Sequence, residues 1–186
     1  MYLFYSIKLI AERKLIYKIL FASIILIIAF SLSSCDKGIA PGEPPSGPAG
    51  FAGKVTFVGE WPEGITRTHL VVFKNSIQSS SDFFPPNLTF IVDSIPYRST
   101  EFTYNSIDNN FVPIFKIGED NYSYVVVAQS KAPEISLDRK DWFVVGVYCI
   151  NGDQTKPKTL TIYPGEITPD VNIVVDFNNP PPQPPE

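Results

Sequence analysis

Short runs in which apolar and polar residues alternate recur along most of the chain, and they restrict its possible folds more than any other feature. Such runs occupy residues 54–58, 66–74, 88–95, 101–104, 121–129, 142–150, 159–163 and 171–177. Alternation with period two is typical of strands that bury one face. Turn residues separate the runs, and segment 132–141 offers at most one helical turn. The pattern predicts an all-β, antiparallel β-sandwich of seven or eight strands within a single domain, residues 51–178.

Residues 142–150 differ from the other runs because they are apolar on both faces. A strand that is buried on both faces is typical of a central position in a sheet. We therefore expect this segment at the centre of its sheet. Cys149 lies within it and is expected to be a small buried apolar residue.

Several segments resemble prealbumin-like domains of the carboxypeptidase-regulatory type, which have an Ig-like sandwich. The resemblance covers about residues 53–177 and rests on G-K-V-T-F-x-G-x-W-P, V-V-F-K, N-Y-S-Y-V-V-V-A-Q, W-F-V-V-G-V-Y and the closing L-T-I-Y-P-G-E-I-T-P-D-V-N-I-V-V-D-F. Bacterial envelope lipoproteins often carry such domains. The resemblance implies a structural, adhesive or ligand-binding module, and it brings no catalytic residue with it.

The N-terminal segment has the organisation of an export signal. Residues 19–30 are apolar except for Ser23, and at 1.5 Å per residue this run covers only about 18 Å, less than a bilayer core of about 30 Å. Four basic residues and one acid precede it. The pattern predicts a signal peptide helix over residues 1–34, with an uncleaved signal anchor as the alternative.

The residues after that run identify the kind of signal. Leu32-Ser33-Ser34-Cys35 resembles the bacterial lipobox, in which an aliphatic residue and two small residues precede a cysteine. The resemblance implies lipidation of Cys35 and cleavage between Ser34 and Cys35. Acyl chains on Cys35 would anchor the chain to an envelope membrane. Asp36 leaves the membrane and the leaflet open.

Two proline-rich segments flank the predicted domain. Residues 35–50 hold four prolines and four glycines, which predicts a disordered tether behind Cys35. Five of the last seven residues are prolines, so segment 179–186 is predicted to be a polyproline-like or disordered tail. A polyproline ligand for a partner protein is the alternative for this tail.

Charge and titratable residues exclude several function classes. The chain has 15 Lys and Arg and 19 Asp and Glu, of which residues 1–34 hold four and one, so the remainder carries a net charge of −7. This gives no basic surface for nucleic acid. His69 is the only histidine, Cys149 is the only thiol left beside Cys35, and no metal-ligand spacing is present. We expect no metal, no cofactor and no enzymatic activity, with His69 as a hydrogen-bonded or solvent-facing residue of its strand.

Aromatic residues are the remaining candidates for contact with a ligand. Phe83 and Phe84 lie in a polar connection and either fold onto the sandwich as a plug or present a contact surface. Trp61 and Trp142 are core-edge residues or, if exposed and coplanar, platforms for sugar rings. The sequence thus predicts a lipid-anchored, non-catalytic envelope module that is structural or binds a ligand, with an envelope protein or glycan as partner. The alternative is a carbohydrate-binding accessory lipoprotein that uses these four aromatic residues.

Overall fold

The computed structural model describes residues 46–185, which form an all-β unit. The predicted signal peptide 1–34, Cys35 with its cleavage site, and most of the tether 35–50 lie outside the described residues. Within residues 46–185, no helix is long and apolar enough to cross a membrane.

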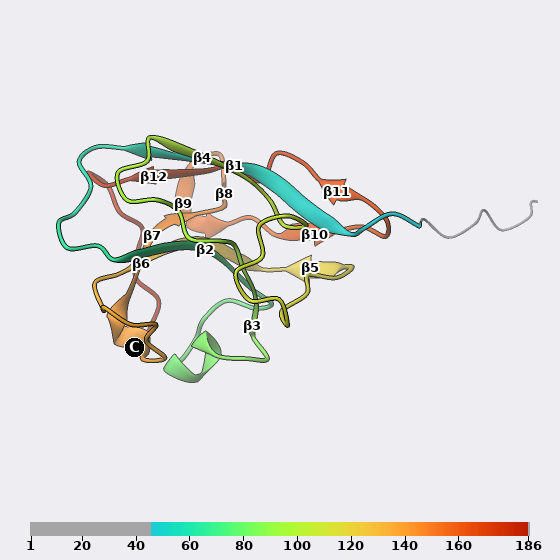
Figure 1. Cartoon of the computed structure of the whole chain (residues 1–186), viewed down its shortest axis with the longest axis horizontal. Helices are drawn as coiled ribbons and strands as arrows, with labels where there is room; N and C mark the ends of the chain where they lie inside the picture. The colour runs from blue at the N-terminus through green and yellow to red at the C-terminus, as the bar shows by residue number, and fades with distance from the viewer. Residues whose placement is uncertain (1–45, 186) are drawn as a thin grey trace, which may run out of the picture. The chain divides into compact units, whose positions relative to one another are not determined.

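Twelve strands and two 3-10 helices make up the regular structure of residues 46–185 (Figure 1). They are β1 (Gly50–Val58), β2 (Arg67–Phe73), η1 (Ser80–Phe83), β3 (Leu88–Ile91), β4 (Glu101–Asn105), β5 (Asp120–Tyr122), β6 (Tyr124–Ser130), η2 (Arg139–Asp141), β7 (Trp142–Val147), β8 (Cys149–Ile150), β9 (Asp153–Pro157), β10 (Leu160–Ile162), β11 (Ile167–Thr168) and β12 (Ile173–Asp176). Each of the eight predicted runs contains at least part of a strand. β9 and β11 fall outside the eight predicted runs, and η2 falls in the segment expected to hold one helical turn.

Strand β1 organises the first layer. β4 pairs with β1 antiparallel, whereas β11 and β12 follow one another along its other edge and run parallel to it, with Gly50 opposite Ile167 and Val55 opposite Ile173. The expectation of a purely antiparallel arrangement is therefore wrong for β11 and β12. Alternation identifies a strand but carries no information about the direction of a partner that is distant in sequence.

The second layer is an antiparallel sheet of order β3-β2-β6-β7. β7 lies at its edge, so the prediction that residues 142–150 form a central strand is wrong. Both faces of β7 are apolar because the first layer covers one face and connecting segments cover the other. In Figure 1, β4, β1 and β12 lie above β2, β6 and β7, with the connecting segments below.

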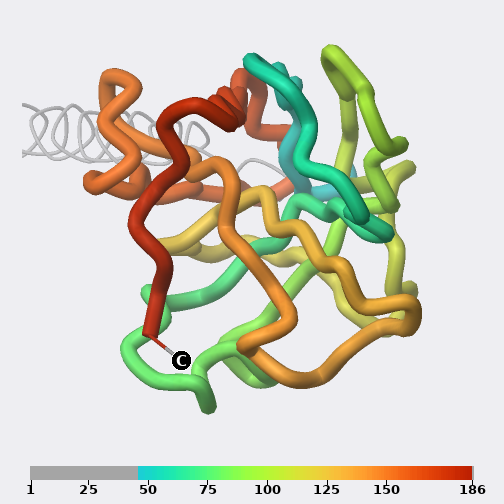
Figure 2. Tube along the Cα trace, turned by 90° about the vertical axis from the view of Figure 1, so that its left-hand side faces the viewer, coloured from blue at the N-terminus to red at the C-terminus, as the bar shows by residue number. Residues whose placement is uncertain are grey.

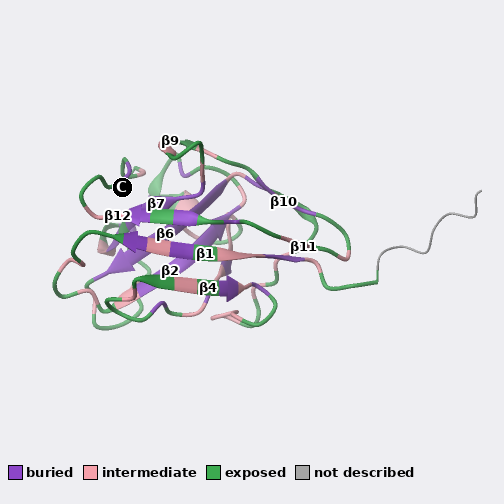
Figure 3. Ribbon diagram, turned by 90° about the horizontal axis from the view of Figure 1, so that it is seen from above, coloured by how far each residue is buried: buried purple, intermediate pink, exposed green. Residues whose placement is uncertain are grey.

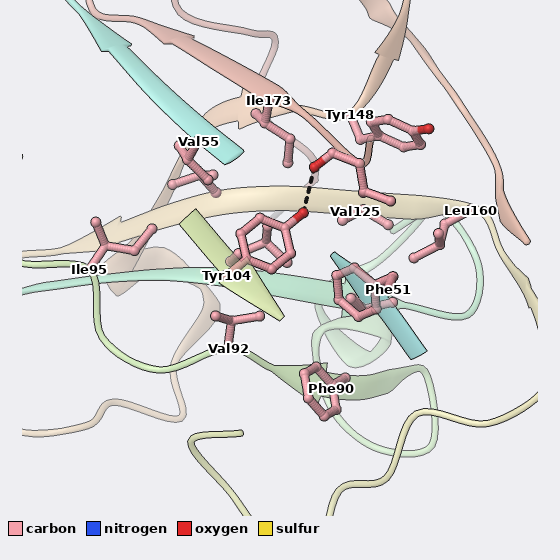
Figure 4. Packing of buried hydrophobic residues seen from close by; sticks show 14 of the residues in the cluster. Phe51, Val55, Phe90, Val92, Ile95, Tyr104, Val125, Tyr148, Leu160 and Ile173 are labelled. Carbon is pink, nitrogen blue, oxygen red and sulfur yellow. Dashed lines mark hydrogen bonds between the residues drawn. The ribbon is translucent and has the colours of Figure 1, made fainter. Parts of the chain in front are cut away.

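The main core lies between the two layers. Val55 and Val175 from the first layer meet Leu70 and Val127 from the second, and all four are fully buried. Exposure alternates along β12, as expected for a layer with one face in solvent (Figure 3). Within the first layer, the Tyr104 hydroxyl of β4 donates a hydrogen bond of 2.5 Å to the carbonyl of Val171, just before β12 (Figure 4).

A second cluster of buried residues lies on the opposite face of the β3-β2-β6-β7 sheet. It contains Val71 and Phe73 of β2, Val126 of β6 and Val144 of β7. β2 and β6 therefore bury both of their faces, as continuous apolar strands do when each face is covered. Residues 46–185, which hold both clusters, belong to one compact unit.

The proline-rich tail, for which no partner within the chain was predicted, contacts the free edge of β7. The Gln183 side chain accepts from the Val144 amide (2.9 Å) and donates to the Val144 carbonyl (2.8 Å), while Gln154 accepts from the Val147 amide. Figure 2 shows the C-terminal segment descending toward the connection that contains η1. Glutamine side chains thus supply the bonds that a neighbouring strand would otherwise make.

The turn predicted at Asn151-Gly152 joins β8 to β9. Both residues have positive φ, 54° and 76°, as the central positions of a type I′ hairpin turn require.

Candidate ligand pocket

The face of the β3-β2-β6-β7 sheet that points away from the first layer carries a cavity of about 400 Å³. Its floor comes from alternate residues of three strands, with Val71 on β2, Ala128 on β6 and Val144 on β7. Ala128 lies opposite His69 on one side and Val144 on the other. Because alanine contributes only a methyl group, the floor is open at this position.

Three connections and the tail form the walls of the cavity. Ile77, Phe83 and Phe84 come from the connection that contains η1, and Phe111 and Phe115 come from the segment after β4. A third wall comes from the segment before β7, which contributes Leu137 and Arg139, and Pro184 adds the tail. The cavity exists because segments distant in sequence close over one face of the sheet.

Carbon atoms make up nearly all of the cavity surface, and the polar lining residues are His69, Ser136 and Arg139. Leu137 and Ile135 line the cavity and are nevertheless 75% and 52% exposed, so they lie where it opens to solvent. Ile114, between the lining residues Val112 and Phe115, is 83% exposed. An apolar cavity with an apolar rim is suited to a ligand with a hydrocarbon body.

His69 is the most unusual residue in the cavity wall, because its side chain is 2% exposed and titratable. Its Nδ1 lies 3.0 Å from the Val92 carbonyl oxygen, and its ring centroid lies 4.6 Å from that of Phe111. Burial holds the pKa of His69 below 6.5; Arg67 also lowers this pKa, whereas the Val92 contact and Asp93 raise it. The imidazole is therefore neutral at pH 7. Within the described part of the chain, Nε2 has no hydrogen-bond partner.

Arg139 ties the walls of the cavity together although it is almost fully buried. Its guanidinium donates to the Trp142 carbonyl oxygen at 2.6 Å and to the Pro184 carbonyl oxygen at 2.9 Å. It also lies 5.8 Å from the centroid of the Phe83 ring. One side chain thereby joins η2, β7, the tail and the η1 connection.

Three of the four aromatic residues predicted as ligand contacts come together in this cavity. Phe83 and Phe84 are half-buried, with ring centroids 5.7 Å apart, and Phe83 lies 6.4 Å from Trp142. Trp142 is 8% exposed and donates from Nε1 to the Ser136 carbonyl. Phe83 packs over Phe73 of β2, so the Phe83 ring covers the outer face of this strand at that position.

Trp61 does not take part in this arrangement. Its ring packs against Phe57 (4.6 Å) and Phe177 (5.3 Å) at the margin of the main core, and its Nε1 donates to the Ser99 carbonyl oxygen. The four rings therefore do not form one common surface.

The other titratable candidates stay outside the cavity. Cys149 is partly buried beside the second cluster, and burial raises the pKa of its thiol. Within residues 46–185, no three His, Cys, Asp or Glu side chains lie close enough together to hold a metal ion.

Sequence reasoning missed several residues of the cavity. His69 was expected to be either hydrogen-bonded or solvent-facing, and the structure shows it hydrogen-bonded and buried; Ala128, Phe111 and Arg139 were not singled out. Leu137 and Ile135, large aliphatic residues in a polar connection, carry the same signal that drew attention to Phe83 and Phe84.

No family model, no curated protein and no solved structure matches this chain.

Proposed function

We propose that this chain is a lipid-anchored protein of the bacterial cell envelope whose β domain, a prealbumin-like sandwich, binds a small apolar ligand without catalysis. The observation that carries the ligand-binding part is the cavity of about 400 Å³ on the outer face of the β3-β2-β6-β7 sheet. Pockets for small molecules have volumes of about 300–1,000 Å³ and are lined mainly by apolar and aromatic side chains.

The chemistry of the lining favours an apolar ligand over a carbohydrate. Stacking on a sugar ring requires an accessible aromatic face, and Trp142 is 8% exposed. A sugar also needs partners for its hydroxyl groups, whereas the lining is almost entirely carbon. The described lining includes no carboxylate and no thiol, which supports a binding role rather than a catalytic one.

The proposed location rests on the sequence of the N-terminal segment. A charged stretch, a short apolar run and Leu32-Ser33-Ser34-Cys35 follow in the order of a lipoprotein signal. Cys35 would then hold acyl chains in an envelope membrane, and residues 36–50 would tether the β domain to it.

Equilibrium dialysis of naphthalene against the full chain in lipid nanodiscs tests the proposed binding, with empty nanodiscs as the blank. We expect saturable binding of one naphthalene per chain. Ala128→Leu fills the open position in the floor and is expected to weaken binding at least tenfold. Val174→Leu, which enlarges a 55% exposed residue of β12, is the matched control and should bind like the wild type. Equal uptake by empty nanodiscs, or unchanged binding in Ala128→Leu, would refute the proposal.

A further inference from the structure

We propose that the ligand of this cavity carries one hydrogen-bond donor, an O–H or N–H group on an otherwise apolar body, and that this donor bonds to Nε2 of His69. This inference rests on the proposed function, because it names the chemical class of the ligand for the same cavity. His69 would then contact the ligand and select for ligands that carry such a donor.

The contact of His69 with the backbone determines which of its nitrogens carries the proton. A carbonyl oxygen only accepts hydrogen bonds, so the 3.0 Å contact between Nδ1 and the Val92 oxygen places the proton on Nδ1. In a neutral imidazole, the other nitrogen is then an acceptor. Nε2 therefore presents a lone pair, and only a donor satisfies it.

The lone pair on Nε2 needs a partner that the described residues do not supply. Buried polar atoms in native proteins are nearly always hydrogen-bonded. His69 is 2% exposed, yet its Nε2 has no partner within residues 46–185. A water molecule is a poor substitute, because a buried water needs two to four polar partners and the lining around His69 is almost entirely carbon.

The surroundings of His69 hold the ring in place among the residues that line the cavity. Phe111 and Trp142 lie beside the imidazole, with centroids at 4.6 and 6.2 Å. The cross-strand neighbour of His69 is Ala128, the smallest side chain of the cavity floor. An aromatic or aliphatic body over Ala128 would bring a single polar group toward the imidazole.

A matched pair of probes separates this inference from the proposed function. Naphthalene has no donor, and 2-naphthol adds one hydroxyl group to the same ring system. We expect His69→Phe, which keeps an aromatic ring but removes the acceptor, to weaken binding of 2-naphthol by about 3- to 10-fold, the loss of one hydrogen bond. Naphthalene makes no hydrogen bond to Nε2, so its affinity should fall at least threefold less than that of 2-naphthol in the same variant. Both affinities are measured by equilibrium dialysis with the full chain in nanodiscs.

The outcomes are distinct. If neither probe binds the wild type, the proposed function fails, and this inference fails with it. If naphthalene binds and His69→Phe affects both probes equally or neither, the inference alone fails. Retained naphthalene binding also shows that the variant is folded.

A spectroscopic measurement decides the question without any variant. Because His69 is the only histidine, ¹⁵N-histidine labelling gives one Nε2 resonance for the whole chain. We expect 2-naphthol to shift this resonance in the direction of a hydrogen-bonded acceptor, and naphthalene to leave it in place. An unchanged resonance with 2-naphthol bound would overturn the assignment.

Discussion

His69 combines a titratable ring with almost complete burial, and this has a consequence for stability. The unfolded chain takes up a proton on His69 as the pH falls through about 6.5, but the folded chain does so only at lower pH because its pKa is lowered. Since the unfolded state binds more protons in this window, the free energy of unfolding should fall from pH 7.5 to pH 5. The slope is at most about 1.4 kcal/mol per pH unit. Urea unfolding at pH 7.5, 6.5 and 5.5 measures it.

The matched variant for this prediction is His69→Phe, which removes the only histidine and should flatten the dependence between pH 7.5 and 5.5. The charged groups around the ring are Arg67 on the same strand, Asp93 next to Val92, and Arg139 across the cavity. Asp153, whose pKa is lowered to about 2, loses its contribution at lower pH and does not act in this window. Equal slopes for wild type and variant would contradict the explanation.

Among the strands, β1 lies in close contact at Gly53 with Val171, in the segment just before β12. A Cβ atom on Gly53 would lie 2.2 Å from the oxygen and 2.6 Å from the carbonyl carbon of Val171. The same carbonyl accepts from Tyr104, so it has little freedom to move. We expect Gly53→Ala to lower the free energy of unfolding by about 1–3 kcal/mol or more through overpacking.

Gly118→Ala is the control for this substitution, because nothing lies within 4 Å of a Cβ atom at Gly118. Its effect should stay within about 0.5 kcal/mol. Chemical unfolding of both variants under the same conditions gives the comparison. If the Gly53→Ala protein is as stable as Gly118→Ala, then β1 and the Val171 backbone move apart at Gly53 without a cost in stability.

Alternation of apolar and polar residues predicts where the strands lie, but it does not predict which strands pair. The run 171–177 contains β12, and Asn151-Gly152 marks a hairpin, because local residue pattern determines both. The parallel pairing of β1 with β12 was not predictable, since it depends on a partner distant in the chain. β7 was misplaced because the first layer covers one of its faces and connecting segments cover the other, while Gln154 and Gln183 bond to its edge.

At the scale of the whole molecule, the candidate site was predictable only in part. Phe83, Phe84 and Trp142 were recognisable as aromatic residues in unusual positions. Their meeting with His69 depends on three connections and the tail closing over one face of a sheet. No local pattern encodes this closure. Arg139, which joins η2, β7, the tail and the η1 connection, has the sequence context of an ordinary surface residue.

The proposed anchor sets how far the β domain extends from its membrane. Fourteen residues, 36–49, separate Cys35 from β1, and a fully extended chain of that length spans at most about 50 Å. The cavity would therefore work close to the membrane surface, where apolar molecules with one polar group accumulate. This places the proposed ligand class and the proposed location in agreement.

Lipidation at Cys35 is tested by labelling the full chain with palmitate in a bacterial host that processes lipoproteins. The thioether forms on the cysteine sulfur, so Cys35→Ala should lose the label. Cys149→Ala removes the other cysteine of the chain and should keep it, which separates loss of the acceptor from loss of any thiol. Two or three acyl chains hold a protein stably on a membrane, so wild type and Cys149→Ala should sediment with membranes while Cys35→Ala loses this acyl attachment. Equal labelling of Cys35→Ala and wild type would place the acyl chains elsewhere and remove the basis for the anchor.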